Sequence, residues 1–183
     1  MLSNARIPVV GFVAPSGTGK TQLVKALIAQ LKSDGYRVAV IKHSHHDFEN
    51  DYPGKDSYEL RQSGAAQMLI ASRHRWAMIT ESDDPEHEVD LNALIQQLDQ
   101  TALDIILVEG FKFEHFAKIE LYREAISAVK SPKKPMYLSD PDIIAVASDQ
   151  PLAEKNNVTA LDINNTEQIL EFILQHFSLH TEN

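Results

Sequence analysis

The sequence predicts an α/β fold in which a mostly parallel sheet carries helices on both faces. Short apolar runs alternate along the chain with segments of helical periodicity, as in strands joined by crossover helices. Two of these runs, IPVVGFV from residue 7 and DIILVEG from residue 104, are apolar almost without alternation, which is typical of strands buried on both faces. Two other runs, joined by a tight polar turn, predict an antiparallel hairpin.

The first half of the chain reads as strand, helix and strand, followed by a hairpin. The first helix is indicated by apolar residues that recur on one face, and Gly35 suits the turn at its end. A long polar loop, KHSHHDFENDYPGKD, follows the second strand. We expect, in order, strand 7–13, helix 21–32, strand 37–41, helix 57–62, hairpin strands 67–72 and 75–80, and helix 91–98.

The second half is expected to add parallel strands and a closing helix. The segment SAVKSPKKPMYLSDPD carries three of the eight prolines, which favours a mobile connection between elements. We expect strands over 104–109, 117–123, 143–147 and 160–163 and a helix over 167–177. Because ligands of such sheets bind beyond the carboxyl ends of the strands, candidate residues should be sought there.

Length and composition exclude several classes of protein. A chain of 183 residues can bury a sizeable core, and we expect one nucleotide-binding domain over residues 1–183. The absence of cysteine excludes disulfides, cysteine-ligated clusters and a cysteine nucleophile. The net charge of −9 disfavours binding to nucleic acid or to anionic membranes. The N-terminus does not read as a signal peptide and no apolar run could span a bilayer, so we expect a cytoplasmic protein.

The segment APSGTGKT between the first strand and the first helix predicts a phosphate-binding loop (P-loop). It fits the pattern G-x-x-x-x-G-K-[ST] except that Ala14 replaces the first glycine. The glycines allow backbone N–H groups to turn inward, Lys20 would reach the β- and γ-phosphates, and Thr21 would ligate Mg²⁺. We therefore expect a P-loop NTPase-like fold. The candidate nucleotide contacts here are Pro15, Ser16, Gly17, Thr18, Gly19, Lys20, Thr21 and Gln22.

A carboxylate on a neighbouring strand should complete the magnesium site. The run DIILVEG offers Asp104 and Glu109, which five residues of extended chain separate by about 16 Å. Only Glu109, at the carboxyl end, can lie near the phosphates. We expect Glu109 to hold Mg²⁺ through water or to orient an attacking water, and Thr21 and Glu109 form the candidate metal set. Capping of a loop is the alternative role for Glu109.

The polar loop KHSHHD leaves the carboxyl end of the second strand, so it should also lie near the phosphates. His43, His45, His46 and Asp47 could bind a metal together, but their spacing is not a specific zinc signature. We favour a loop in which His43 and Asp47 contact nucleotide or substrate, and a plain solvated loop remains open. Asp51 extends the same surface.

Three further strand-end or turn segments carry polar residues. Thr80 and Glu81 follow one strand and Asp149 follows another, so all three are candidates for contacting the base or sugar of a nucleotide. Ordinary loop chemistry is an equally open reading of these residues. The basic turn at 73–75 could bind an anion, but a solvated turn is favoured.

Several segments together resemble one family. SGTGKT, IKHSHHD, PGKDSYELRQSGAAQ, RWAMITE, LVEGFK and AVASD occur in this order between about residues 8 and 149. In this combination the chain resembles the molybdopterin-guanine dinucleotide biosynthesis adaptor protein B (MobB) family. The resemblance implies a homodimeric, GTP-binding protein with weak GTPase activity. It implies as partners the molybdopterin guanylyltransferase and the molybdopterin cofactor, which that enzyme converts to its guanine dinucleotide form.

The phosphate loop contacts only phosphates, so recognition of the guanine base that the resemblance implies requires another residue. Guanine presents N1–H and an N2 amino group side by side, and one carboxylate can accept from both. Asp149 is our first candidate for this role and Glu81 the second.

Two other functions use the same phosphate loop. A small-metabolite kinase is the main alternative, and it would need an acceptor pocket and mobile arginines such as Arg73, Arg75 or Arg123. A nucleotide-gated interaction module, in which hydrolysis is incidental, is the other. Transfer of phosphate to a metabolite would separate the kinase from both remaining readings.

Overall fold

The chain forms two compact units, one of Met1–His43 with Asp90–Asn183 and one of Ser44–Val89. The structure is a computed structural model that describes residues 2–44, 51–82, 84, 88–126, 134–152 and 158–180. The expectation of one nucleotide-binding domain over residues 1–183 stays a prediction.

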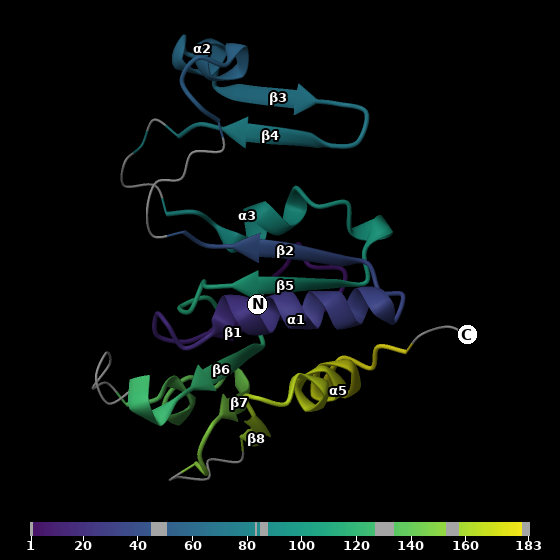
Figure 1. Ribbon diagram of the computed structural model, residues 1–183, viewed down its shortest axis with the longest axis vertical. Coiled ribbons are helices and arrows are strands. Elements are labelled where there is room, and N and C mark those ends of the chain that lie inside the picture. Colours follow the sequence, from purple (N-terminus) through teal and green to yellow (C-terminus); the bar gives the residue numbers. More distant parts are fainter. Residues whose placement is uncertain are drawn as a thin grey trace. The chain divides into compact units, whose positions relative to one another are not determined.

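The larger unit is built on a six-stranded sheet with the order β2-β5-β1-β6-β7-β8 (Figure 1). All of its strand pairs are parallel, as the continuous apolar runs predict. The strands are β1 (Val9–Val13), β2 (Val38–Lys42), β5 (Ile105–Glu109), β6 (Lys118–Tyr122), β7 (Ile143–Ser148) and β8 (Thr159–Asp162). Because β1 lies between β5 and β6, the loop that follows β1 is flanked by the ends of both neighbours.

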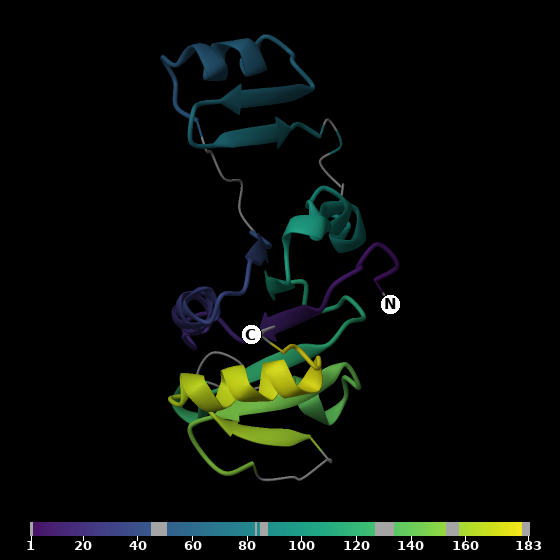
Figure 2. The ribbon, with the colours of Figure 1, turned by 90° about the vertical axis from the view of Figure 1, so that its right-hand side faces the viewer.

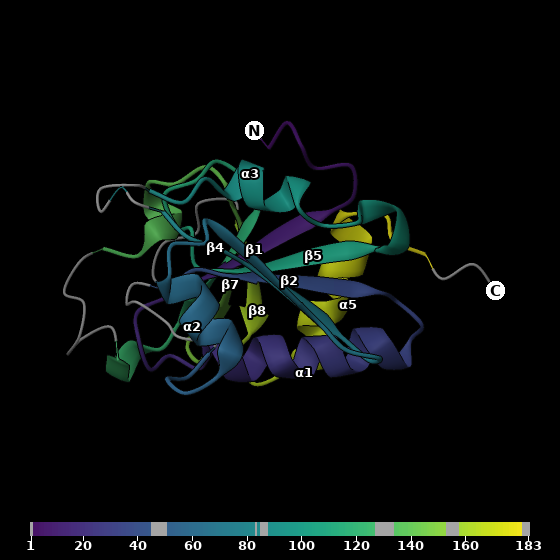
Figure 3. The ribbon, with the colours of Figure 1, turned by 90° about the horizontal axis from the view of Figure 1, so that it is seen from above.

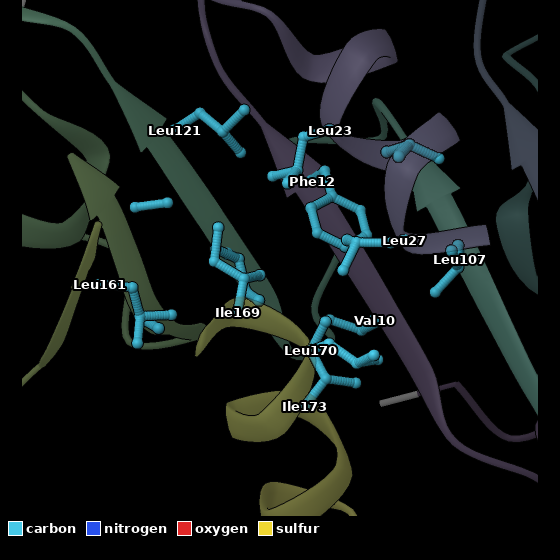
Figure 4. Close-up of a cluster of buried hydrophobic side chains, with 14 of the residues drawn as sticks. Val10, Phe12, Leu23, Leu27, Leu107, Leu121, Leu161, Ile169, Leu170 and Ile173 are labelled. Carbon is cyan, nitrogen blue, oxygen red and sulfur yellow. The ribbon is translucent and has the colours of Figure 1, made fainter. Parts of the chain in front are cut away.

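Helices cover both faces of this sheet, as predicted. Helices α1 (Lys20–Ser33) and α5 (Thr166–His176) pack on one face, where Phe12, Leu27 and Ile169 are fully buried (Figure 4). Burying a side chain of this kind contributes about 1.5–3 kcal/mol to stability. Helix α3 (Leu91–Gln96) covers the other face, and Figures 2 and 3 show α1 and α3 on opposite sides of the strands.

Two short 3₁₀ helices complete the larger unit. They are η1 (Gln100–Ala102) and η2 (Met136–Leu138). The sequence did not indicate η2, which lies in the proline-rich segment expected to be mobile. Its start is held by Glu120 of β6, whose carboxylate accepts from the backbone N–H groups of Met136 at 2.9 Å and Tyr137 at 2.8 Å. Residues 127–133 of that segment lie outside the described residues.

The smaller unit contains the predicted hairpin. Helix α2 (Asp56–Gln62) precedes the antiparallel strands β3 (Gln67–Ala71) and β4 (Trp76–Thr80). The 73–75 turn closes the hairpin through a bond from the N–H of Ser72 to the carbonyl of Arg75. In the residues described, no helix is long and apolar enough to cross a membrane.

Candidate nucleotide-binding site

The loop between β1 and α1 has a defined backbone conformation. Gly17 and Gly19 have φ angles of 86° and 103°, which side-chain-bearing residues rarely adopt. Thr18 is 2% exposed, and its hydroxyl donates to the carbonyl of Pro15 at 2.8 Å. Gly19 occupies the N-cap position of α1, so the first N–H groups of the helix face the loop. A helix start of this kind attracts anionic groups.

Lys20 begins α1 and folds its side chain back over the loop. Its Nζ donates to the carbonyl of Ala14 at 2.8 Å and lies 3.4 Å from that of Pro15. Burial lowers the pKa of Lys20, Glu109 opposes this shift, and Lys42 and Lys112 lower the pKa further. The ammonium group therefore lies in a cluster of cations that is incompletely neutralised by the protein itself, an environment suited to an anionic ligand.

Thr21 and Glu109 bring two oxygen-bearing groups together. The Thr21 hydroxyl donates to the Glu109 carboxylate, at 2.9 Å from Oε1 and 3.2 Å from Oε2. Glu109 ends β5 opposite Phe12 of β1, and this register brings it beside the loop. Asp104 lies at the other end of the same strand, where it pairs with Arg37 at 2.9 Å.

The residues of this site suit a triphosphate with Mg²⁺. Magnesium prefers oxygen ligands such as carboxylates and hydroxyls, and Thr21 and Glu109 present one of each in direct contact. Lys42 Nζ, 3.5 Å from Glu109 Oε1, adds a cation at the rim. The N–H groups at the start of α1 and the ammonium group of Lys20 would supply the complementary donors for phosphate oxygens.

Comparison with known proteins places the chain in a family. A family model described as "Molybdopterin guanine dinucleotide synthesis protein B" matches residues 9–149. The chain belongs to this family.

Two relatives resemble this family member over nearly its whole length. The molybdopterin-guanine dinucleotide biosynthesis adapter protein of Escherichia coli (strain K12) is 49% identical over 175 residues, which cover 96% of each chain. The protein of the same name from Haemophilus influenzae is 42% identical over 177 residues, covering 95% of this chain and 93% of the relative.

A solved structure of the MobB family shares the fold. The crystal structure of Bacillus subtilis MobB superposes with a TM-score of 0.71 at 18% identity, covering 95% of this chain and 100% of that chain. The P-loop NTPase-like α/β fold predicted from the sequence is thereby confirmed.

A second group of side chains in this MobB family member lies around Arg123, directly after β6. Its Nε donates to the carbonyl of Thr18 at 3.1 Å, and one terminal nitrogen donates to Asn164 Oδ1 at 3.1 Å. The other terminal nitrogen lies 3.8 Å from Asp149 Oδ2. The N–H of Glu124 donates to Asp149 Oδ1 at 3.2 Å. Asp149 is therefore linked to the phosphate loop through one guanidinium group.

His43 contacts the end of β5. Its backbone N–H donates to the carbonyl of Glu109 at 2.9 Å, and its ring stacks on Phe111 with centroids 4.6 Å apart. Gly110 is required at this crossing because its φ is 104° and an added Cβ would lie 2.8 Å from His43 Cβ. The backbone thus fixes His43 beside Glu109.

The other residues of the histidine loop, His45, His46 and Asp47, lie outside the described residues. Within the described ranges, no group of three or more histidines, cysteines or acidic residues could hold a metal ion. Nucleotide contact by His43 and Asp47 stays a prediction.

Three candidate residues of the smaller unit lie among the described residues. Asp51 is 7% exposed, and its Oδ1 accepts from the N–H of Tyr52 at 3.0 Å. Thr80 ends β4, and Glu81 forms an ion pair with the buried guanidinium of Arg61. This pairing occupies part of the Glu81 carboxylate, just as the contacts with Arg123 and Glu124 occupy part of the Asp149 carboxylate.

Sequence reasoning did not single out Lys42, Lys112 or Asn164. Lys42 ends β2 and Asn164 follows β8, so the rule that ligands bind beyond the carboxyl ends of strands could have found both. Lys112 follows β5 by three residues and carried no pattern signal. The sequence suggests Arg123 only as a mobile residue of a kinase, whereas the structure shows it bound to the carbonyl of Thr18 in the phosphate loop.

Proposed function

We propose that this protein is a GTP-binding adapter in molybdopterin guanine dinucleotide synthesis. It binds GTP with Mg²⁺ at the phosphate loop, hydrolyses it slowly, and assists the guanylyltransferase that acts on the molybdopterin cofactor. The contact between the Thr21 hydroxyl and the Glu109 carboxylate carries the nucleotide part of the proposal. The names of the two close relatives, both adapter proteins of this synthesis, support the pathway.

Each residue of the site has a distinct task in this proposal. Lys20 holds the loop closed through the carbonyl of Ala14 and presents its charge to the phosphates. Thr21 and Glu109 would hold the metal, which when bound would neutralise charge on the phosphate oxygens. The Glu109 carboxylate accepts a hydrogen bond from the Thr21 hydroxyl and would accept one from a water positioned for hydrolysis. Pro15, Ser16, Thr18 and Gln22 shape the remainder of the phosphate cradle.

We propose further that the protein is a homodimer, and the apolar surface of the smaller unit supports this. Four large apolar side chains of the hairpin are exposed, namely Leu69 (59%), Ile70 (40%), Trp76 (66%) and Met78 (42%). In the described residues the two strands pair only with each other, so each has one edge available for hydrogen bonding. A second copy would cover these side chains and pair an edge with its own hairpin.

The alternative of a small-metabolite kinase finds less support. Arg123 is held by Thr18, Asn164 and Asp149, so it is not placed as a residue that closes over a transferring phosphate. Arg73 and Arg75 form the hairpin turn of the smaller unit. Phosphate transfer from GTP to a metabolite would revive this reading.

Reconstitution of dinucleotide formation tests the adapter proposal. Purified guanylyltransferase, molybdopterin cofactor and Mg·GTP are incubated with and without this protein, and the dinucleotide product and GDP are quantified. We expect faster product formation in its presence and none with this protein alone. Identical rates with and without the protein would contradict the adapter role, and Lys20→Ala serves as the matched nucleotide-deficient variant.

A further inference from the structure

Arg123 holds two polar side chains from different loops against the phosphate loop. Asp149 follows β7 and Asn164 follows β8, and both lie within reach of one guanidinium group. The third contact of the same group is the carbonyl of Thr18, which is 2% exposed. Three loops at the carboxyl edge of the sheet therefore meet at Arg123.

The contact with Arg123 fixes the orientation of the Asn164 amide. A guanidinium group only donates hydrogen bonds, so the atom of Asn164 that faces it must be the acceptor Oδ1. The donor–acceptor distance is 3.1 Å. The amide nitrogen Nδ2 consequently points away from Arg123, and among the described residues it makes no hydrogen bond. Asn164 thus presents a donor while its oxygen is bound to the guanidinium group that also contacts Asp149.

Asp149 presents acceptors at the same guanidinium group. Its carboxylate has about four lone-pair positions. The N–H of Glu124 takes one on Oδ1, and Arg123 lies close to Oδ2. The remaining positions are available to donors on a ligand.

We propose that Asn164 and Asp149 together read the edge of guanine, with Arg123 as the positioning residue. Asn164 Nδ2 donates to O6, and Asp149 accepts from N1–H and the N2 amino group. This inference rests on the proposed function, since it assigns the base specificity of the same nucleotide site. Guanine offers the acceptor O6 beside the donors N1–H and the N2 amino group. The Asn164 donor and the Asp149 acceptors are complementary to this pattern. Adenine carries an amino group in place of O6 and an acceptor at N1. Its amino group would face the donor of Asn164, and its N1 would face the Asp149 carboxylate, so neither hydrogen bond would form.

Nucleotide affinities of Asn164 variants test the assignment. Calorimetry with Mg·GTP, Mg·ITP and Mg·ATP is carried out on parent, Asn164→Ala and Asn164→Asp. Asn164→Ala should weaken GTP and ITP by the same factor, roughly 3- to 10-fold, because both bases keep O6, and should leave ATP within twofold. Asn164→Asp keeps the shape and the bond from Arg123 but replaces the donor by an acceptor. It should weaken GTP more than Asn164→Ala does.

Two further variants separate reading of the base from structural effects. Asn165 is the matched control, because its side chain caps α5 by accepting from the N–H of Gln168 at 3.0 Å. Asn165→Ala should lower stability and leave the ratio of GTP to ATP affinity unchanged. Arg123→Lys, which can hold only one of the two side chains, should reduce that ratio while ATP binding persists.

The outcomes distinguish this inference from the proposed function. A parent protein that binds GTP in preference to ATP, with Asn164→Ala weakening both equally or neither, would overturn the inference and leave the GTP-binding adapter intact. A parent protein with no affinity for GTP would overturn both.

Discussion

The hydroxyl of Thr21 lies 2.9 Å from Glu109 Oε1 although the two residues are 88 positions apart in the chain. The contact joins the first turn of α1 to the last residue of β5. It arises because β5 pairs directly with β1, whose end leads into the helix. The consequence is that the group expected to ligate the metal and the group expected to assist hydrolysis share one hydrogen bond.

Glu109→Gln should slow GTP hydrolysis much more than it weakens nucleotide binding. A carboxylate that orients water or stabilises charge acts mainly in the transition state, so we expect a rate decrease of about 100-fold or more. The amide oxygen can still accept from Thr21, and binding should change by less than tenfold. Single-turnover hydrolysis and calorimetry measure the two effects.

Asp104→Asn is the matched control for that experiment. It changes a carboxylate in the same strand, at the end where Asp104 pairs with Arg37. We expect hydrolysis and GTP affinity to remain close to those of the parent, with at most a small loss of stability. A larger effect on hydrolysis from Asp104→Asn than from Glu109→Gln would contradict the assignment.

Lys20→Ala should weaken binding of GTP by roughly 10- to 100-fold, the range of one charge-assisted hydrogen bond. The ammonium group supplies charge that backbone N–H groups cannot replace. Because Lys20 also holds the carbonyl of Ala14, circular dichroism should accompany calorimetry to establish that the fold is retained. Equal affinity of a folded variant and the parent would exclude a phosphate-binding role for Lys20.

Gly11→Ala should destabilise the protein by about 1–3 kcal/mol through overpacking. An added Cβ would lie 2.7 Å from the ring of Phe116 and 2.9 Å from Cγ of Lys118, and both neighbours are buried. Urea denaturation measures the loss. If Gly11→Ala were as stable as the parent, Phe116 and Lys118 would be able to move aside without loss of packing energy, which would contradict this prediction.

The arrangement around Glu109 could be predicted because it depends only on strand direction. Asp104 and Glu109 stand at opposite ends of one apolar run. The direction of that strand alone therefore predicts that Glu109, and not Asp104, lies beside the phosphate loop. The same holds for Asp149 at the end of β7. Strand order was not needed for these inferences, since the carboxyl ends of all strands of a parallel sheet meet at one edge.

The environment of β6 could not be read from the sequence. The run AKIELYR alternates polar and apolar residues, which is typical of a strand with one solvated face. Lys118 and Glu120 are instead 1% and 4% exposed. Lys118 is satisfied by the carbonyl of Glu114 at 2.7 Å and by Asp140 at 2.9 Å, contacts that depend on how distant loops fold back. The contacts of Arg123 with three loops could not be predicted either, because they too depend on how segments distant in the sequence fold together.

Glu120 should make stability fall as pH rises. Burial raises the pKa of its carboxyl, the hydrogen bonds from Met136 and Tyr137 oppose the shift, and Asp140 adds to it. The unfolded chain releases this proton near the ordinary glutamate pKa of about 4.3, whereas the native state retains it to higher pH. Between the two pKa values the native state binds more protons, so the free energy of unfolding decreases with rising pH.

The variant Glu120→Gln isolates this contribution. Urea denaturation of parent and variant from about pH 4 to neutral gives the difference in their unfolding free energies, which removes the contributions of all other groups. The stability of the parent relative to the variant should decrease as pH rises through this range. A difference that is constant or increases with pH would show that the pKa of Glu120 is not raised in the native state.

Asp149→Asn should abolish the preference for GTP over ATP and improve the binding of xanthosine triphosphate. In the parent with ATP, the Asp149 carboxylate would face the N1 acceptor of adenine and would have no N1–H or N2 amino donor. This loss costs roughly 1–3 kcal/mol, which corresponds to a tenfold or greater preference for GTP over ATP. The new amide can accept from N1–H of xanthine and donate to its second exocyclic oxygen. Its oxygen can also accept the hydrogen bond from the N–H of Glu124, which is 3.2 Å long in the parent, so the conformation of the loop should be retained. Competitive binding of the three nucleotides to parent and variant measures the ranking. An unchanged ranking would remove Asp149 from the base site and direct attention to Glu81.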